Sequence, residues 1–454
     1  MGNAFAGAAS RYVRDAESSP VAWKPWGPAA IELARKSNRP LFVSVGFASS
    51  YDAFAMHRDA FNTAAIAAAL NGEFVPVLLD RFEHAEAAEA LDTLQQAMGG
   101  ALANPSMFVL TPALEPFAQG GPMEARELGA FLAAAATRWA NERDAATAEA
   151  RAILVKAHLL GEQRAPGDTD AATLNAAIES VAQAFKPAAP RPMAISFALR
   201  HATATDNRAV RAVALDALRT FAKSPVRDQL GGGFFRAAGE YDKLLSDQAL
   251  FAMTYLEAWQ LTREPEFEQV VRTTLDYALR DLNVTKGGFE ATQDAYGLVP
   301  VDGRPVFLEG AFYLWSKDEL VRLFGADTAA KLMRIFGMAQ GTDNLPVLAE
   351  EAPEELKPAV AKMLEHRQRR PEPFRDSSHL SGWNGLMISA LSRAGAALGE
   401  PRYTDAAVAA ARAVTTKLWN DKKKILHRGD SASGQVAEAT ADDHAMLVQG
   451  LLDV

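Results

Sequence analysis

The chain has 454 residues, 49% of them hydrophobic, no cysteine and a formal net charge of −9. Without a thiol it forms no disulfide, thiolate metal site or cysteine nucleophile, and its mild acidity argues against nucleic acid, which binds basic faces. No apolar run approaches the roughly 20 residues that span a bilayer, and the N-terminus lacks the pattern of a signal peptide. We therefore expect a cytoplasmic protein with no membrane or nucleic-acid partner; a trimmed leader is compatible with this expectation.

The first part of the chain predicts an α/β unit with a parallel core. An apolar strand is expected at 40–45, a second at 73–80 and a third directly after Asn104-Pro105. Helices are expected at 28–36, from about Ala53, at 63–70 and at 86–98. Strands that alternate with helices at this spacing are typical of a sheet that is covered on both faces.

The turn after the first strand is where many redox proteins carry a C-x-x-C motif, because a helix N-terminus lowers the pKa of a thiol. Here the two positions hold Ser50 and Ala53. A nucleophilic role for the Ser50 hydroxyl would need a general base, for which the sequence offers Asp52 and His57. The alternative, that Ser50 caps the following helix, is favoured.

From residue 124 onward strand signals almost vanish, and the sequence predicts helices that recur in pairs. The expected helices are 125–140, 145–160, 171–185, 207–222, 242–261, 266–282, 317–324, 327–336, 383–398, 402–419 and 441–454. Such pairs indicate stacked αα-hairpins in a toroid or solenoid. The predicted domains are an α/β domain at 1–123, a helical connecting segment at 124–190 and a helical domain at 191–454.

A series of motifs occurs in a specific order along nearly the whole chain. They are R-P-L-F-V-S-V-G (39–46), D-Q-L-G-G-G-F (228–234), D-K-L-L-S-D-Q-A-L (242–250), G-G-F-E-A-T-Q-D-A (287–295), G-A-F-Y-L-W (310–315) and L-S-G-W-N-G-L-M (380–387), preceded by N-A-F-A and S-P-V-A-W-K-P-W-G. This order resembles the spermatogenesis-associated protein 20 family. The resemblance implies a thioredoxin-like DUF255 domain followed by an (α/α)6 barrel akin to sugar 2-epimerases and six-hairpin glycosidases. Family members continue past residue 454, so a barrel truncated relative to the family is expected.

The resemblance also shows where the chain departs from the family. The family motif C-H-W-C-H-V-M falls on residues 50–56, of which only Met56 is retained, and the family's cis-proline falls on Pro105. Phe235 stands where the family has histidine, while Lys243 is kept. A family aspartate-lysine pair falls on Ser377 and Ser378. The resemblance therefore implies a redox-inactive thioredoxin-like domain and altered polar chemistry in the barrel.

Carboxylates and aromatic rings in the barrel motifs predict a site for a carbohydrate, whose ring stacks on aromatic faces and whose chemistry uses paired carboxyls. The candidate catalytic residues are Asp294, Glu309 and Asp443. The candidate ligand-binding residues are Arg236, Lys243, Asp247, Tyr313, Trp383, Asn384 and His379.

Each of these residues has a plainer alternative. Carboxylates serve as helix caps or ion-pair partners, tryptophan serves in packing, and histidine is usually exposed or satisfied. Asn384 begins a helix and is a candidate cap, and an ion pair with Asp247 one helical turn on would explain Lys243 equally well.

Two functional hypotheses follow. In the first, a redox-inactive thioredoxin-like domain accompanies a toroid that binds or isomerises a carbohydrate-like ligand, with epimerase-, isomerase- or glycosidase-like activity. In the second, the chain is a non-catalytic interaction or scaffold protein, with a protein partner or a homodimer at its C-terminal edge. The sequence predicts no cofactor, metal set or glycine-rich phosphate loop.

Overall fold

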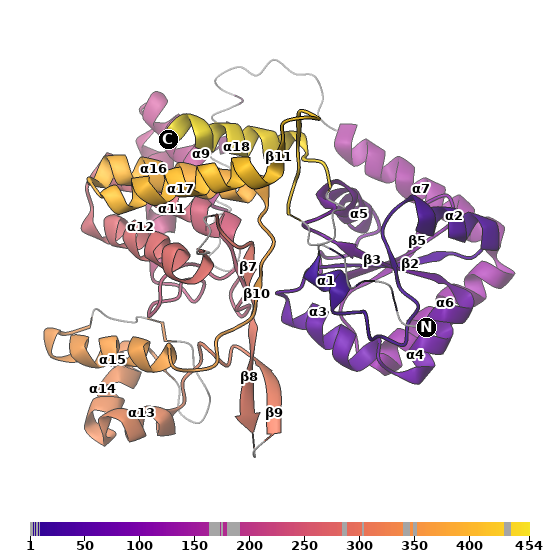
Figure 1. Ribbon diagram of the computed structural model, residues 1–454, viewed down its shortest axis with the longest axis horizontal. Coiled ribbons are helices and arrows are strands. Elements are labelled where there is room, and N and C mark those ends of the chain that lie inside the picture. The colour runs from indigo at the N-terminus through magenta and orange to yellow at the C-terminus, as the bar shows by residue number, and fades with distance from the viewer. Residues whose placement is uncertain are drawn as a thin grey trace. The chain divides into compact units, whose positions relative to one another are not determined.

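The computed structural model describes residues 3, 5, 8, 10–162, 173, 176–178, 191–283, 288–301, 304–338, 346–347, 352–430 and 437–454. The chain divides into two compact units, the first built mainly of residues 1–167 and the second of residues 168–429 and 438–454 (Figure 1). The first unit is an α/β domain and the second is largely helical. The predicted domain order, thioredoxin-like and then helical, is confirmed.

The first unit is built on a five-stranded sheet of order β1-β3-β2-β4-β5. The strands are β1 (Lys24–Pro25), β2 (Leu41–Gly46), β3 (Val75–Asp80), β4 (Ser106–Leu110) and β5 (Pro116–Gly120). The first three are parallel, whereas β4 pairs antiparallel with β2, and β5 pairs antiparallel with β4. Every residue of β2, β3 and β4 is buried, which explains their continuous apolar sequence. The parallel core is therefore limited to one half of the sheet. The edge strands β1 and β5 were not predicted from the sequence.

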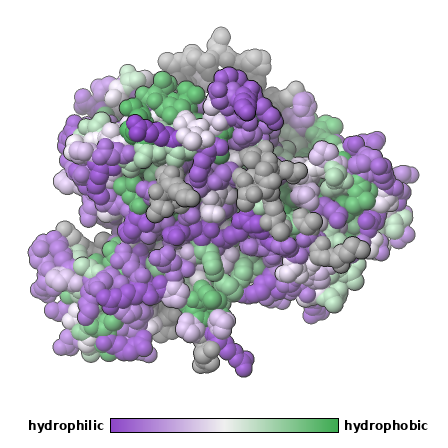
Figure 2. Space-filling model, in the orientation of Figure 1, coloured by the Kyte–Doolittle hydropathy of each residue, from purple (hydrophilic) through white to green (hydrophobic). Residues whose placement is uncertain are grey.

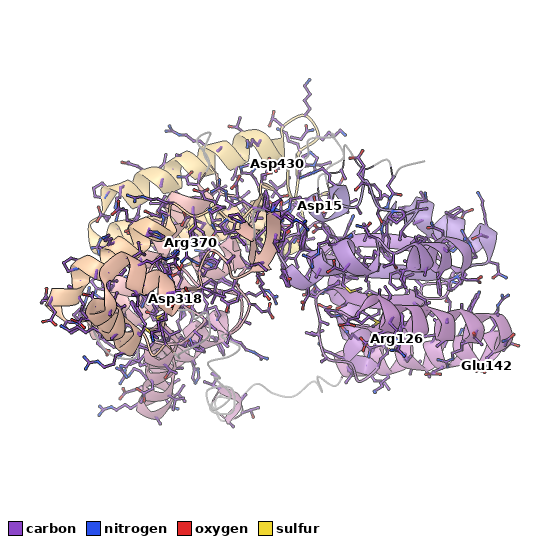
Figure 3. The ribbon with its side chains drawn as sticks, turned by 90° about the horizontal axis from the view of Figure 1, so that it is seen from below. Asp15, Arg126, Glu142, Asp318, Arg370 and Asp430 are labelled. Atoms are coloured by element: carbon purple, nitrogen blue, oxygen red, sulfur yellow. The ribbon has the colours of Figure 1, made fainter. Side chains whose placement is uncertain are left out.

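Helices cover both faces of this sheet. They are α1 (Arg11–Arg14), α2 (Pro28–Ser37), α3 (Tyr51–Ala55) with its π-helical continuation η1 (Met56–Ala60), α4 (Ala64–Glu73), α5 (Ala85–Ala97), α6 (Ala125–Asn141) and α7 (Arg143–Glu162). One apolar core joins α1, α3, α4 and α6, and the other joins α2, α5 and α7. Arg126 and Glu142 mark the two ends of α6 in Figure 3. Helices α6 and α7 thus pack within the first unit.

The second unit is a layered array of helix hairpins. Its helices are α9 (Pro192–Ala204), α10 (Arg208–Ala222), α11 (Leu245–Thr262), α12 (Pro265–Tyr277) with its continuation η2 (Ala278–Leu282), α16 (Ser381–Leu398), α17 (Pro401–Leu418) and α18 (Ala441–Asp453). The helices α9, α11, α16 and α18 pack in succession, and α10, α12 and α17 pack outside them (Figure 1). One large apolar core joins the array. Of the helix expected at 171–185, the structure describes only residues 173 and 176–178.

The second unit contains strands that were not predicted from the sequence, and most of them lie in an insertion between α12 and α16. A three-stranded sheet of order β10-β7-β6 joins β6 (Lys243–Leu244), β7 (Thr292–Gln293) and β10 (Arg375–Asp376). The hairpins are β8 (Tyr296–Val301) with β9 (Arg304–Glu309) and, after α17, β11 (Trp419–Asn420) with β12 (Ile425–Leu426). The expectation that strands vanish after residue 124 was therefore wrong. Five of these strands have only two residues each, and Pro300 and Pro305 interrupt the usual strand signal of β8 and β9.

Three helices of the insertion form a small apolar cluster of their own: α13 (Lys317–Phe324), α14 (Ala326–Ile335) and α15 (Lys357–Arg367), the last preceded by the 3-10 turn η3 (Glu354–Leu356). Arg370, labelled with Asp318 in Figure 3, fastens this cluster. Its guanidinium donates to the carbonyl oxygens of residues 311, 312 and 314 and forms a bidentate ion pair with Glu319 at 2.8 and 2.9 Å. The loop after β9 is thereby joined to the end of α15.

The surface of the helical unit carries exposed apolar side chains on α18. Val448, Leu451 and Leu452 are exposed, Leu452 to 78%, and Figure 2 shows hydrophobic surface over this part of the molecule. Among the described helices, none combines the length and the apolar character needed to cross a membrane.

Helices α16 and α18 meet backbone to backbone. A Cβ atom on Gly385 would lie 2.5 Å from the Cα atom of Leu447 and from the carbonyl oxygen of Met446, and a Cβ on Gly450 would collide with the backbone of Gly385. Glycine at both positions therefore sets the separation of the two helices.

We predict that Gly385→Ala destabilises the helical unit by roughly 1 to 3 kcal/mol or more, because the added methyl group overpacks a contact between two backbones. Chemical denaturation followed by circular dichroism measures the change. Gly129→Ala in α6 is the matched control: its Cβ would meet only the Cδ1 atom of Ile66 at 3.6 Å. The control should gain about 0.5 to 1 kcal/mol in helix propensity, so equal effects of the two substitutions would contradict the prediction.

Candidate functional site

The degenerate redox turn lies where the sequence predicts it, between β2 and α3. Ser50 is the N-cap of α3, and its hydroxyl accepts a hydrogen bond from the backbone N–H of Ala53 at 3.4 Å. The peptide bond between Asn104 and Pro105 is cis, as predicted. The chain therefore keeps the backbone of a redox turn with a capping hydroxyl and a methyl group in place of the two sulfurs.

His57 follows this turn and sits in aromatic surroundings. Its ring centroid lies 4.9 Å from Tyr12, 5.5 Å from Phe61 and 6.3 Å from Trp23, and its Nε2 atom is buried without a hydrogen-bond partner. Desolvation lowers the pKa of His57 to about 4. The imidazole is thus neutral at physiological pH and packs as part of the core.

In the helical unit, Asp228 is the centre of a buried charge network. Its carboxylate accepts from the Lys243 ammonium at 2.8 Å and from two nitrogens of the Arg367 guanidinium at 2.8 and 2.9 Å. The backbone N–H groups of Leu230 and Gly231 add hydrogen bonds of 3.1 and 3.0 Å. The three charged side chains are at most 2% exposed. They form a fixed internal network, and the two cations hold the pKa of Asp228 far below its ordinary value despite its burial.

Aromatic rings surround the ammonium group of Lys243. The rings of Tyr277, Phe235 and Tyr313 have their centroids 4.2, 4.9 and 5.0 Å from Nζ, and the hydroxyls of both tyrosines donate to the Gln293 side chain at 3.0 and 2.8 Å. Burial lowers the pKa of Lys243 to about 8. Lys243 pairs with Asp228, so the alternative of an ion pair with Asp247 was wrong. Lys243 and Tyr313 were predicted to bind ligand, but their described contacts are internal.

A second group of polar residues lies next to this network and reaches the surface; we call it the Asp247 cluster. It consists of Arg236, Tyr241, Asp242, Asp247 and Glu309. Arg236 pairs with the buried Asp242 at 2.9 Å and also with Glu240. Arg236, Asp247 and Glu309 were predicted from the sequence. Tyr241 and Asp242 were not, although they immediately precede Lys243 in its motif.

Among the carboxyl groups of the cluster, Asp247 has a strongly raised pKa. It lies half-buried in the first turn of α11, where the helix N-terminus favours the ionised form. Desolvation, reinforced by the negative charge of Asp242 and opposed by Arg236, nevertheless raises the pKa of Asp247 to about 7. Asp242, held by Arg236, has its pKa raised by burial. The cluster thus contains two carboxyl groups in different environments.

Tyr241 supplies the aromatic surface of the cluster. Its half-buried ring stacks on Tyr313 with centroids 6.1 Å apart and meets Phe235 edge-on at 5.6 Å. Burial and the nearby carboxylate of Glu309 raise the pKa of Tyr241. Glu309 ends β9, so the hairpin brings a third carboxyl toward this ring.

Asp443 and Trp383 have contacts that match the plainer alternatives, whereas Asn384 is not the predicted helix cap, because α16 begins at Ser381. Asp443 forms a capping box with Thr440 at the start of α18 and pairs with Arg428 at 2.6 Å. Asn384 exchanges two hydrogen bonds with the backbone of Phe289, at 2.8 and 3.0 Å. Trp383 is half-buried and packs against the main helical core.

The two remaining candidates lie on the loops that flank the three-stranded sheet. Asp294 is fully buried after β7, and its backbone N–H donates to the carbonyl oxygen of Phe374 at 2.8 Å. His379 is buried ahead of α16, where a Cβ on Gly288 would lie 3.1 Å from its ring. Their roles in ligand binding or catalysis stay predictions.

Residues 2–158 match the family model of the thioredoxin-like DUF255 proteins, described as proteins of unknown function. Human spermatogenesis-associated protein 20 is 27% identical over 98% of this chain and 66% of its own length. An uncharacterized Caenorhabditis elegans protein, B0495.5, is 26% identical over 98% of this chain and 70% of its own length. The chain resembles the spermatogenesis-associated protein 20 family, with the C-x-x-C motif lost. It spans slightly less than two thirds of the human relative.

Solved structures similar to this chain include a GH76 α-mannanase of Bacteroides thetaiotaomicron, 12% identical over 58% of this chain and 49% of that chain, with a TM-score of 0.34. A cellobiose 2-epimerase from Spirochaeta thermophila is 14% identical over 58% of this chain and 70% of that chain, with a TM-score of 0.24. At these scores the likeness identifies neither a ligand nor a reaction for this chain.

We predict that Asp247→Asn stabilises the helical unit at pH 8 by roughly 1 to 3 kcal/mol. The folded-state pKa of about 7 lies above the ordinary value of 3.8, so folded Asp247 favours its proton. Its ionisation therefore removes stability as the pH rises from about 4 to 7. The gain should vanish below pH 4, as measured by denaturation across pH. Asp405→Asn, an exposed substitution on α17, is the control, and a gain that does not depend on pH would contradict the prediction.

For His57 the pH dependence of stability has the opposite sign, so stability falls as the pH falls. Its folded-state pKa of about 4 lies below the ordinary value of 6.5, so the first unit should lose up to roughly 3 kcal/mol as the pH falls from 6.5 to 4. His57→Phe should remove this loss, and its stability relative to the parent should rise over that range in pH-dependent denaturation. The substitution His158→Gln, at an exposed position of α7, is the matched control. Parallel pH profiles for His57→Phe and the parent would contradict the prediction.

Proposed function

We propose that the helical unit binds a small carbohydrate-like ligand at the Asp247 cluster, while the thioredoxin-like unit takes no part in thiol exchange. The observation that carries this proposal is Asp247 itself: a half-buried carboxyl with a pKa of about 7 beside a second carboxyl that an arginine holds. A group with such a pKa exchanges its proton near neutral pH, and general acid–base chemistry needs this property.

The composition of the cluster supports a sugar over other polar ligands. Sugar rings present one apolar face and many hydroxyls, and the half-buried ring of Tyr241 offers a surface of matching character. Arg236 and Glu309 supply a donor and an acceptor for hydroxyl groups. Two carboxyls in unlike environments are the arrangement that sugar-processing sites use for acid and base roles.

The proposal changes the roles predicted from the sequence. Asp443, expected to be catalytic, has its carboxylate engaged by Arg428 and Thr440. We therefore place the catalytic role on Asp247 rather than on Asp443, and keep Glu309 as a further carboxyl of the cluster. Isomerisation, which requires proton transfer at a sugar carbon, is the reaction class that Asp247 and Glu309 would serve.

The test is a thermal-shift and calorimetric screen with glucose, mannose, N-acetylglucosamine and cellobiose. A binder at 100 times its dissociation constant should stabilise the protein by about 2.7 kcal/mol. Asp247→Asn and Tyr241→Ala should each weaken binding, whereas Asp405→Asn on α17 should not. In the parent, affinity should change between about pH 6 and 8, around the pKa of Asp247, and this change should be absent in Asp247→Asn.

The proposal fails if none of these sugars binds saturably, or if both cluster variants bind a sugar as the parent does. The second candidate function, binding of a protein partner, would then be favoured by the exposed apolar surface of α18. The exposed apolar side chains of Val448, Leu451 and Leu452 on α18 offer a surface for a protein partner.

A further inference from the structure

A second cleft lies in the helical unit, away from the residues of the Asp247 cluster. It has a volume of about 810 Å³ and is bounded by the end of α10, the helix α12 and the insertion helices α14 and α15. This volume is in the range of small-molecule sites. Its lining includes the polar residues Lys223, Arg227, Gln229 and Thr273 and the apolar residues Phe336 and Val360.

The side chain of Arg227 is the unusual feature of this cleft. It is 9% exposed, and its guanidinium donates only to neutral acceptors: the carbonyl oxygen of Ala222 at 3.1 Å, the Gln229 side chain at 3.3 Å and the Thr273 hydroxyl at 3.2 Å. Its Nε atom is buried and has no hydrogen-bond partner within the described part of the chain. Arg227 is thus a buried cation with an unused donor.

The neighbouring charges do not neutralise Arg227. The adjacent Asp228 is already shared by Lys243 and Arg367. Glu266, a carboxylate on the cleft wall, pairs with Lys223 at 3.4 Å. Among the described residues that line the cleft, the cations Lys223, Arg227 and Lys357 outnumber this acid three to one.

Burying a cation without a counter-ion is unfavourable, because its hydration is lost and no opposite charge replaces it. An anion that entered the cleft would supply the missing negative charge. Guanidinium groups suit this role, since their planar donors match the oxygens of phosphate and carboxylate groups.

We propose that this cleft binds a small organic anion, whose phosphate or carboxylate pairs with Arg227 while its carbon skeleton packs against Phe336 and Val360. Lys223 and Lys357 would draw the anion toward the cleft by long-range attraction. The site is independent of the sugar proposal, because it uses none of the residues of the Asp247 cluster and would stand if that cluster bound nothing.

The probe is phenyl phosphate, titrated by calorimetry into the full chain at constant ionic strength, with inorganic phosphate and benzoate as companion probes. Phenyl phosphate should bind saturably and more tightly than inorganic phosphate. Arg227→Gln should weaken it at least roughly tenfold, as expected for loss of a charged hydrogen-bonding pair. Lys223→Gln should have a smaller effect, of about threefold.

Two controls separate this site from non-specific charge effects. Arg208→Gln removes an exposed cation at the start of α10, the helix whose other end borders the cleft, and should leave binding unchanged. Val360→Ser should weaken phenyl phosphate without changing inorganic phosphate, because it alters only the apolar wall.

A stability measurement keeps the proposal testable if a variant binds nothing. Without a ligand, Arg227→Gln should be at least as stable as the parent in denaturation, since it removes an uncompensated buried charge. A clear loss of stability would show that Arg227 serves the fold and would overturn the proposal. Unsaturable binding of phenyl phosphate, or equal binding by the parent and Arg227→Gln, would overturn it as well.

Discussion

The helical unit depends on a single buried carboxylate. Asp228 joins Lys243 from strand β6, Arg367 from the end of α15 and the backbone of its own glycine-rich loop into one network. Removing one partner of such a network typically costs roughly 3 to 5 kcal/mol, because a charge is left buried without its counterpart. The same network fixes the strand that carries Lys243, and so positions the half-buried Tyr241 and Asp247 and the buried Asp242 beside it.

The two units illustrate different fates of polar chemistry within one chain. In the first unit, a turn suited to a reactive thiol holds Ser50, whose hydroxyl caps helix α3. In the second, polar groups are plentiful, and burial divides them into two kinds. Polar groups that are fully enclosed, such as Lys243, stabilise the fold. By contrast, Asp247 near the surface has a raised pKa, and Arg227 beside the cleft has a donor atom without a hydrogen-bond partner.

Local patterns predicted much of the fold. The buried strands β2 to β4 are continuous apolar runs, and most helices follow periodic patterns, so the sequence locates them. Strands β1 and β8 were missed because each contains a proline, which interrupts the usual strand signal. In the site, Arg236, Asp247 and Glu309 could be nominated by residue type alone. The pairing of Asp228 with Arg367 could not, since 139 positions separate them and only the folded chain brings them together.

The contact between Gly385 and Gly450 has a mechanical consequence for α18. Where two helices meet through side chains, rotamer changes let them slide or tilt by small amounts. Here the main chains themselves touch, and main chains offer no such adjustment. A shift of α18 along α16 would bring residues that carry a Cβ atom into a contact that only glycine fits, so the two glycines fix the register of these helices.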